Sequence, residues 1–279
     1  MNRAESIDHA ARMEGLKEYQ TQFCIDADQK IGFSGKDVLE IGGHLPERFV
    51  LGALGARSWT ALEDMTYWPE GMNFPIDFHS FTDAALSEQP YRILNGKIEE
   101  LPTAFHRRFD LIVSIAAFQH IHMLPSALDT MFHALRPNGR LLAFFGPVWS
   151  APQGHILSGI TDALGRDFNF GQSPLPDWGH LYLSSSEAYL ELCKKMDRPT
   201  AARIVFQIYT SSRVNRFFVE DYIQFARLSL FASHGGLNNI YGAGLIPLPP
   251  ERQSQLEALY PGRKRFDITN LIFDMTRRE

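Results

Sequence analysis

The sequence predicts an α/β protein in which an open, twisted and mostly parallel sheet carries helices on both faces. Short apolar runs alternate with segments of helical periodicity over residues 36–146, turns rich in glycine separate the units, and one run is too apolar to leave a solvent face. Strands that alternate with helices are typical of parallel sheets with right-handed crossovers. Strands buried on both faces are almost continuously hydrophobic.

The composition is that of an ordinary globular protein. The 279 residues are 44% hydrophobic and 21% charged, and the formal net charge is −5, which argues against a disordered or fibrous chain. A chain of this size buries about 75% of the surface that it exposes when unfolded. We therefore predict a single domain over residues 1–279. The negative net charge gives no overall attraction for nucleic acid.

Cysteine usage and the N-terminal residues bear on the cellular compartment. Cys24 and Cys193 are far apart and form no CxxC pair, so neither a disulfide framework nor a thiolate zinc site is predicted. Charged residues between positions 3 and 18 interrupt any secretory signal, and no apolar run reaches the roughly 18 residues that span a bilayer. We expect a cytoplasmic protein without membrane association, and a homo-oligomer is left open.

The elements of the first half follow in order. Residues 3–23 have a loose helical spacing, which predicts a helix in the N-terminal segment 1–30 that partly closes the ligand cleft. The apolar run at 38–41 stops at paired glycines and predicts the first strand. Similar runs at 59–62 and 91–94 end in polar or turn residues and predict the next two strands.

The run at 109–115 is the clearest strand, because it is rich in β-branched residues and has no polar face. Apolar residues then recur at helical spacing from Leu124 to Leu135. The turn at 136–139 separates this helix from a strand at 140–145. Helix, turn and strand together form half of a crossover unit.

Two lid insertions are predicted beyond residue 146. Prolines, glycines and aromatic residues dominate 147–183, which suits a loop that covers a substrate. The second insertion, 213–250, combines helical spacing at 217–231 with a loop rich in glycine and proline at 234–250.

The remaining segments of the second half have short periodic patterns. Residues 186–196 have helical spacing, whereas 202–209 alternate like a strand. The C-terminal region 251–279 contains a final predicted strand at 266–275.

A candidate ligand site lies where the first strand ends. Glu40, Gly42 and Gly43 would place backbone N–H groups against a ligand at the carboxyl edge of the sheet. Glu63 ends the second strand, where an acid can accept hydrogen bonds from ribose hydroxyls. His44 follows Gly43, so the G-x-G-x-x-G fingerprint of dinucleotide sites is absent. The expected ligand is a nucleoside without phosphates.

The order of these motifs resembles the class I S-adenosylmethionine-dependent methyltransferases, over about residues 36–146. The matching pieces are Val38-Leu39-Glu40-Ile41-Gly42-Gly43, Glu63, Glu99-Glu100-Leu101-Pro102, Phe109-Asp110-Leu111-Ile112-Val113-Ser114 with Phe118-Gln119-His120-Ile121, and Leu135-Arg136-Pro137-Asn138-Gly139-Arg140-Leu141. The resemblance implies a Rossmann-like fold with a cofactor-binding core at 31–146. It implies S-adenosyl-L-methionine as cofactor. The two lid segments rich in aromatic residues favour a pocket that buries a small ligand, so we expect the acceptor to be a hydroxyl group of a small molecule.

The resemblance also implies the residues that hold the cofactor. These are Glu40, Gly42, Gly43, His44, Glu63, Asp64, Lys97, Ile98, Glu99, Ser114, Ala116 and Gln119. Three positions depart from the family pattern. Leu45-Pro46 stands in place of a third glycine, Lys97 replaces an acid, and Gln119 replaces a glutamate.

Methyl transfer, as the resemblance implies it, depends mainly on positioning the reactants. A hydroxyl acceptor would need a base near neutral pH, for which histidine is best suited. His155, which follows the fifth strand at the same sheet edge, is the first candidate, and His180 is the second. The predicted substrate-binding residues are Trp149, Asp177, Trp178 and Tyr182.

Several alternatives remain open at this point. An enzyme that methylates nitrogen, carbon or a carboxylate would not need a histidine. A non-catalytic protein could keep the nucleoside pocket, and a nicotinamide oxidoreductase would fit the glycine loop poorly. His155 and His180 could stabilise loops, and Trp149 and Trp178 could form the lid's own core.

Other polar clusters point less clearly to a function. His120 and His122 resemble a metal pair, but the sequence offers no further ligands nearby, so no metal site is predicted. A group at 213–222 would either bind a substrate anion or form a solvated face. Its members are Arg213, Asn215, Arg216 and Tyr222.

Overall fold

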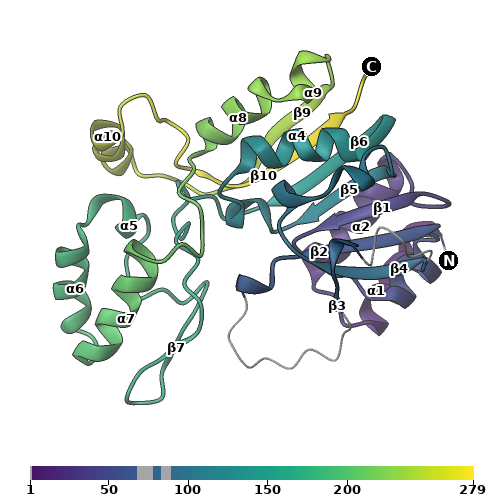
Figure 1. Cartoon of the computed structure of the whole chain (residues 1–279). Helices are drawn as coiled ribbons and strands as arrows, with labels where there is room; N and C mark the ends of the chain where they lie inside the picture. Colours follow the sequence, from purple (N-terminus) through teal and green to yellow (C-terminus); the bar gives the residue numbers. More distant parts are fainter. Residues whose placement is uncertain (1, 68–77, 83–88) are drawn as a thin grey trace.

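The computed structural model describes residues 2–67, 78–82 and 89–279. Its centre is an eight-stranded sheet (Figure 1). The strands are β1 (Asp37–Ile41), β2 (Ser58–Glu63), β3 (Phe78–His79), β4 (Tyr91–Asn95), β5 (Phe109–Ile115), β6 (Leu135–Phe145), β9 (Leu237–Leu245) and β10 (Ile268–Thr276). They lie in the order β3-β4-β2-β1-β5-β6-β10-β9.

The pairing of these strands confirms the predicted fold class. All neighbours from β3 to β6 run parallel. Only β10 runs antiparallel to both of its neighbours, β6 and β9. The sheet is therefore mixed but mostly parallel, and its chain order reverses at β1, which lies between β2 and β5.

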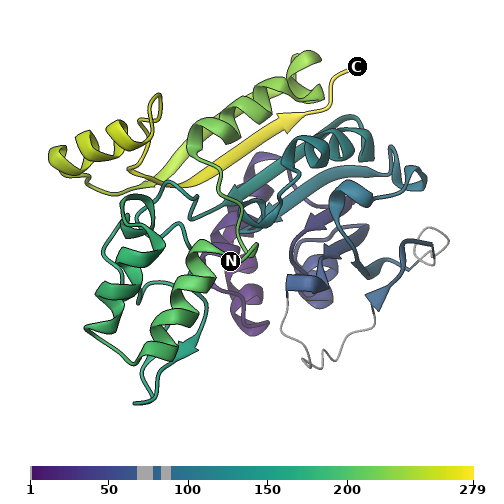
Figure 2. The same ribbon diagram turned by 60° about the vertical axis from the view of Figure 1, so that its left-hand side comes forward.

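Helices cover both faces of the sheet (Figures 1 and 2). One face carries α1 (Arg3–Met13) and α2 (Glu18–Lys30), and the other carries α4 (Leu124–Ala134), α8 (Val219–Leu228) and α9 (Leu230–Ser233). Successive side chains of a strand point to opposite faces. Accordingly, Val38 packs into the cluster that includes α1 and α2, and Leu39 into the cluster that includes α4. This two-sided burial explains the continuous apolar runs.

A helical unit stands beside the sheet and has its own hydrophobic core. It consists of α5 (Gly179–Tyr182), α6 (Ser185–Cys193), α7 (Arg198–Tyr209) and the short hairpin of β7 (Ile160–Thr161) and β8 (Asp167–Phe168), and α10 (Pro250–Leu259) lies against α5. Leu157, Leu192 and Ile204 are fully buried between its members. None of the helices in the described ranges combines the length and apolar composition that crossing a bilayer requires.

Most predicted elements are confirmed. The strands at 38–41, 59–62, 91–94, 109–115, 140–145 and 266–275 correspond to β1, β2, β4, β5, β6 and β10, and the helices at 124–135, 186–196 and 217–231 correspond to α4, α6 and the α8–α9 pair. The single predicted N-terminal helix is wrong in number, because Gly15, at φ +72°, separates α1 from α2.

The strand predicted at 202–209 is wrong, because these residues belong to α7. Ile204 and Ile208, one helical turn apart, are buried in the core of the helical unit. The helix begins at Asp197, whose carboxylate accepts a hydrogen bond from the Thr200 backbone N–H, and Pro199 occupies the first turn. This start signal outweighs the apparent alternation.

The lid predicted at 213–250 is also corrected. Its helices α8 and α9 pack against α4 on the sheet. Residues 237–245, expected as loop, form the edge strand β9, which pairs with β10. Gly242 belongs there because a Cβ atom at this position would lie 2.9 Å from the Ile268 side chain. Glycine in this strand therefore marks close packing.

Candidate active site

A cavity of about 360 Å³, here called the edge cavity, opens at the carboxyl ends of the parallel strands. Gly42 follows β1, Glu63 ends β2, Lys97 follows β4 and Ala116 follows β5, and all four line it. Open α/β sheets bind ligands at the point where the strand order reverses. The edge cavity occupies this point, between β2 and β5 on either side of β1.

The turn after β1 requires glycine at Gly42. Its φ is +72°, and a Cβ atom would lie 2.2 Å from the Cβ of Ala117. At Gly43 a Cβ atom would lie 2.8 Å from a carboxylate oxygen of Glu40. Neither glycine therefore places a side chain between the end of β1 and the edge cavity, so a ligand can approach the backbone of the turn directly.

Gly42→Ala is expected to lower the free energy of unfolding by about 1–3 kcal/mol beyond the strain of the positive φ, because the turn must shift to relieve the overlap. The control is Gly15→Ala, which has the same φ of +72° but nothing within 4 Å. Chemical denaturation of both variants measures the difference. Equal losses in the two variants would show that the contact with Ala117 is unimportant.

Glu40 holds this loop from behind the edge cavity. Its Oε2 accepts hydrogen bonds from the Leu45 backbone N–H at 2.9 Å and from Trp59 Nε1 at 2.7 Å. Burial raises the pKa of Glu40 to about 7. Leu45, which replaces the third glycine of the family pattern, buries its side chain while its N–H bonds to Glu40. The altered loop is therefore a packed structure.

Glu63 lines the edge cavity and pairs with the loop. His44 Nδ1 lies 3.1 Å from Glu63 Oε1, and this hydrogen bond raises the pKa of His44. Glu63 Oε2 accepts no hydrogen bond within the described part of the chain. One oxygen thus positions the loop and the other remains for a ligand.

The predicted cofactor residues divide into two groups. Those that line the edge cavity are Gly42, Glu63, Asp64, Lys97, Ile98, Glu99 and Ala116. The other five do not line it: Glu40, Ser114 and Gln119 are buried behind its wall, and Gly43 and His44 are partly exposed. The helices α1 and α2, expected to help close the cleft, pack on the sheet face and do not line it.

Two of the residues behind the wall support the strand ends. Ser114 Oγ donates a hydrogen bond to the Ile41 carbonyl at 3.0 Å, which ties β5 to the end of β1. Gln119 Nε2 donates to the Ala116 carbonyl at 2.7 Å. Ala116 has a positive φ of 56°, so Gln119 stabilises a strained position on the cavity rim.

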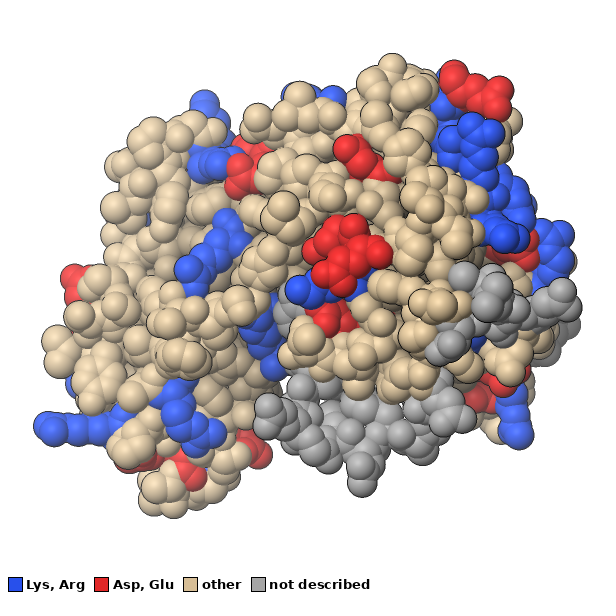
Figure 3. Space-filling view, viewed as in Figure 1, with Lys and Arg blue, Asp and Glu red and all other residues tan. Residues whose placement is uncertain are grey.

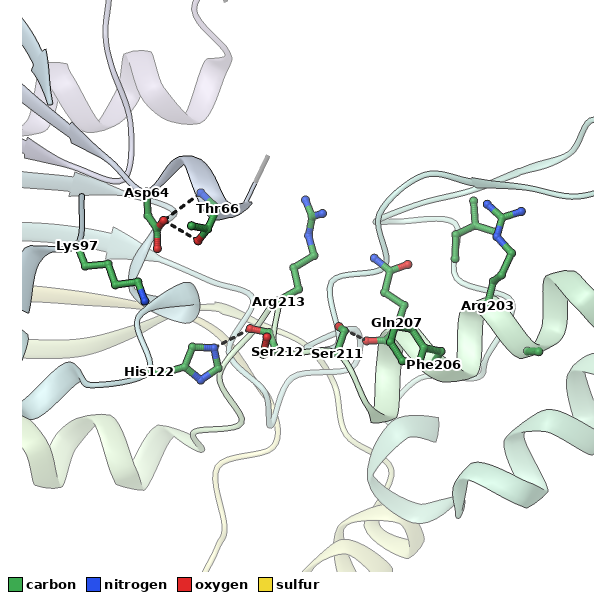
Figure 4. Close-up of a pocket in the computed structure, with 12 residues that line it drawn as sticks. Asp64, Thr66, Lys97, His122, Arg203, Phe206, Gln207, Ser211, Ser212 and Arg213 are labelled. Carbon is green, nitrogen blue, oxygen red and sulfur yellow. Dashed lines mark hydrogen bonds between the residues drawn. The ribbon is translucent and has the colours of Figure 1, made fainter. Parts of the chain in front are cut away.

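A second and larger cavity, of about 900 Å³, adjoins the edge cavity and is here called the α7 cavity (Figure 4). Four residues line both cavities: Asp64, Lys97, His122 and Arg213. The opposite wall comes from α7 and from the segment that follows it, through Ala202, Arg203, Phe206, Gln207, Ser211 and Ser212. A ligand at the sheet edge and a ligand against α7 would meet at the shared residues.

The segment that links α7 to α8 is fastened to the rim of the edge cavity. His120 Nδ1 donates to the Arg213 carbonyl, and His122 Nε2 donates to the Ser212 carbonyl, each at 2.7 Å. The backbone N–H of Asn215 donates to the Gln119 carbonyl at 2.8 Å. This anchorage fixes the position of the α7 cavity relative to the sheet.

His155 and His180, the predicted bases, line neither cavity. They are 3% and 4% exposed, and their rings lie 5.0 Å apart. Burial lowers the pKa of His155 to about 4, and burial together with the charge of His155 lowers that of His180 to about 3. His180 Nε2 donates to the Trp149 carbonyl, and His155 Nε2 contacts Ser173 Oγ. These contacts are structural.

The predicted substrate-binding residues also lie away from both cavities. Trp149 and Trp178 are buried with Phe266 in a cluster that joins the helical unit to the sheet, and Trp178 Nε1 donates to the Phe266 carbonyl. The Tyr182 ring packs under Arg252, and Asp177 is exposed. The two tryptophans therefore belong to the core at the junction between the helical unit and the sheet.

Three residues of the α7 cavity were not predicted from the sequence: Arg203, Phe206 and Gln207. They lie on one face of α7, three and four residues apart. The segment was predicted as a strand, in which Phe206 would point to the face opposite Arg203 and Gln207. The helix-start signal at Asp197 and Pro199 could have revealed them.

Comparison with protein families agrees with the motif order. Residues 76–143 match the model of a family described as a methyltransferase domain. This range includes the ends of β4 and β5 that line the edge cavity. No curated protein matches the sequence.

Solved structures of similar architecture include three methyltransferases. An S-adenosylmethionine-dependent methyltransferase from Mesorhizobium loti is 16% identical, with a TM-score of 0.45 over 91% of this chain and 98% of that one. Phosphoethanolamine N-methyltransferase 2 of Haemonchus contortus, in complex with S-adenosyl-L-methionine, is 12% identical, with a TM-score of 0.50 over 99% and 57%. The 1,6-didemethyltoxoflavin-N1-methyltransferase of Burkholderia thailandensis is 13% identical, with a TM-score of 0.42 over 99% and 87%.

The strand order and the site agree with the family match. The strand order of the sheet reverses at β1. A glycine turn follows β1 and an acid ends β2, and both line the edge cavity. The matched range contains β4 and β5, whose ends complete the cavity wall. Residues 76–143 thus match a methyltransferase domain, and they lie within a Rossmann-like, mostly parallel sheet of the order β3-β4-β2-β1-β5-β6-β10-β9.

Proposed function

We propose that the chain binds S-adenosyl-L-methionine in the edge cavity and methylates a hydroxyl group of a small molecule held in the α7 cavity. The observation that carries the proposal is the junction of the two cavities at four shared residues. A concave site of this kind suits a small acceptor. The structure of the Haemonchus contortus relative contains S-adenosyl-L-methionine, which supports the same donor here.

The residues of the edge cavity fit an adenosine moiety. Glu63 offers a carboxylate oxygen for the ribose hydroxyls, and Leu62 and Ile98 offer apolar contacts for a base. Gly42 leaves room for close approach to the backbone. When bound, S-adenosyl-L-methionine supplies a methyl group on a positively charged sulfur, which leaves as a neutral thioether.

His122 is the proposed general base in place of His155 and His180. It lines both cavities, and its Nε2–H donates to the Ser212 carbonyl. A carbonyl can only accept a hydrogen bond, so in the neutral ring Nδ1 keeps the lone pair that takes a proton. His122 would receive the hydroxyl proton as the oxygen attacks the methyl group.

Binding and transfer are tested in sequence. Isothermal titration with S-adenosyl-L-methionine is expected to show saturable binding with one site per chain. Transfer of a radiolabelled methyl group to small metabolites, separated from protein and RNA, would follow. Absence of donor binding, or label found only on macromolecules, would overturn the proposal.

His122→Gln is expected to lower kcat at least about 100-fold while leaving donor affinity unchanged, because glutamine can donate to Ser212 but cannot take the proton. The matched control is His155→Gln, which should retain turnover because His155 lies away from both cavities. Steady-state kinetics of both variants decide the assignment. An unchanged kcat in His122→Gln would favour a nitrogen, carbon or carboxylate acceptor. A lower kcat in His155→Gln alone would identify His155 as the base.

A further inference from the structure

The α7 cavity has a local charge opposite to that of the whole chain. Lys97, Arg203 and Arg213 line it with a single carboxylate, Asp64, although the chain carries a net charge of −5. Asp64 Oδ1 already accepts hydrogen bonds from the backbone N–H and the hydroxyl of Thr66. Blue side chains follow the border between the helical unit and the sheet in Figure 3. The cleft is therefore locally positive.

Among the residues that the structure describes, the cations of this cavity have no carboxylate partners. Lys97, Arg203 and Arg213 form no ion pair within the described residues, and the Arg203 guanidinium only donates to the Thr161 carbonyl, at 3.3 Å. Arginines elsewhere differ, since Arg57 and Arg140 each pair with an aspartate at 2.5–2.6 Å. Three cationic side chains that form no ion pair with a described residue and line the same α7 cavity favour an anionic ligand.

Arg213 is held in place, unlike an ordinary surface arginine. Its backbone carbonyl accepts the hydrogen bond from His120, and the neighbouring Ser212 carbonyl accepts the one from His122. Asn215 Nδ2 donates to two carbonyls of the same turn, those of Phe118 and Ile121. The Arg213 side chain therefore starts from a fixed backbone and lines both cavities. Figure 4 shows it between Lys97 at the sheet edge and Gln207 on α7.

An aromatic surface lies beside these cations. Phe206 is 60% exposed on the face of α7 that lines the cavity, between Arg203 and Gln207. Ile204 and Ile208 of α7 are buried on its opposite side, and Val205 and Tyr209 are partly buried against the same core. Exposure of a phenylalanine inside a cleft indicates contact with an apolar part of a ligand.

We infer that the acceptor is a small molecule with an oxyanion, a carboxylate or a phosphate, attached to an aromatic or apolar body. Arg213 and Arg203 bind the anion, since a guanidinium matches the paired oxygens of either group. Lys97 adds a point charge, and Phe206 packs on the apolar body. This inference rests on the proposed function, because it names the class of substrate for the same site.

The experiment uses simple probes on the full chain saturated with S-adenosylhomocysteine. Benzoate and phenyl phosphate test the two sources of the anion, and benzyl alcohol is the neutral probe of similar shape. Calorimetry should show binding of at least one anionic probe, weakened by salt, and at least tenfold weaker binding of benzyl alcohol. Arg213→Gln should weaken anion binding at least tenfold. The control is Arg227→Gln, an exposed arginine on α8 outside both cavities, which should leave it unchanged.

The outcomes separate this inference from the proposed function. Equal binding of neutral and anionic probes, no binding of any probe, or unchanged affinity in Arg213→Gln would overturn the anionic acceptor even if S-adenosylhomocysteine binds. The same titrations are repeated without S-adenosylhomocysteine. Anion binding that depends on Arg213 in a chain that does not bind the donor product would support the anion site and overturn the proposed donor.

Discussion

Lowering the pH from 7 to 5 is expected to destabilise the protein by about 4 kcal/mol through His155 and His180 alone. The pKa values of these histidines fall from about 6.5 when unfolded to about 4 and about 3 in the fold, chiefly because both are buried. As the pH falls below 6.5, His155 and His180 each bind a proton in the unfolded chain but remain neutral in the folded chain. The two histidines therefore have almost no effect on stability well above pH 6.5, and they destabilise the fold progressively as the pH falls toward 3.

Urea denaturation at pH 7 and at pH 5 measures this loss. His155→Gln and His180→Gln should each reduce the difference between the two pH values by about 2 kcal/mol, whatever their stability at pH 7. The raised pKa of Glu40 acts with the opposite sign, but it is common to all the proteins compared. His9→Gln, on the exposed surface of α1, is the control and should keep the wild-type difference. Identical differences in all four proteins would contradict the assignment.

Glu63→Ala is expected to weaken binding of S-adenosyl-L-methionine by about 10- to 150-fold. The ribose hydroxyls would lose a charged acceptor that contributes about 1.5–3 kcal/mol. The carboxylate lies at the end of β2, lines the edge cavity and has one oxygen that no described residue occupies. Isothermal titration with the donor and with S-adenosylhomocysteine gives both dissociation constants.

The matched control for this variant is Glu47→Ala. Glu47 is an exposed acid that follows the same glycine loop and does not line the edge cavity, so its loss should leave the dissociation constants unchanged. Thermal denaturation checks that both variants fold. An unaltered affinity in Glu63→Ala, or equal weakening in both variants, would mean that another group holds the ribose.

The cofactor half of the site was predictable because its signals are local. A strand, a glycine turn and an acid at the next strand end are each a few residues long, and parallel strands bring their carboxyl ends to one edge. Gly42, Glu63 and Lys97 consequently line the cavity where the sequence placed them. Local pattern did not distinguish Ser114, which supports a strand, from Ala116, which lines the cavity.

The acceptor half was not predictable in the same way. Trp149 and His155 have the chemistry of a substrate site, but long-range packing buries them in the helical unit and its junction with the sheet. Arg203 and Phe206 come from a helix more than 80 residues along the chain from His122, and only the fastening of 212–215 to the edge-cavity rim brings them opposite it.

The sequence alone determined the parallel sheet, its strand ends and the nucleoside-type ligand, since periodicity and turn chemistry act over a few residues. The tertiary structure alone decided which histidines face a cavity and which cations surround the acceptor. Those properties depend on burial between segments distant in the chain, and burial changes both the exposure and the pKa of a side chain without changing its identity.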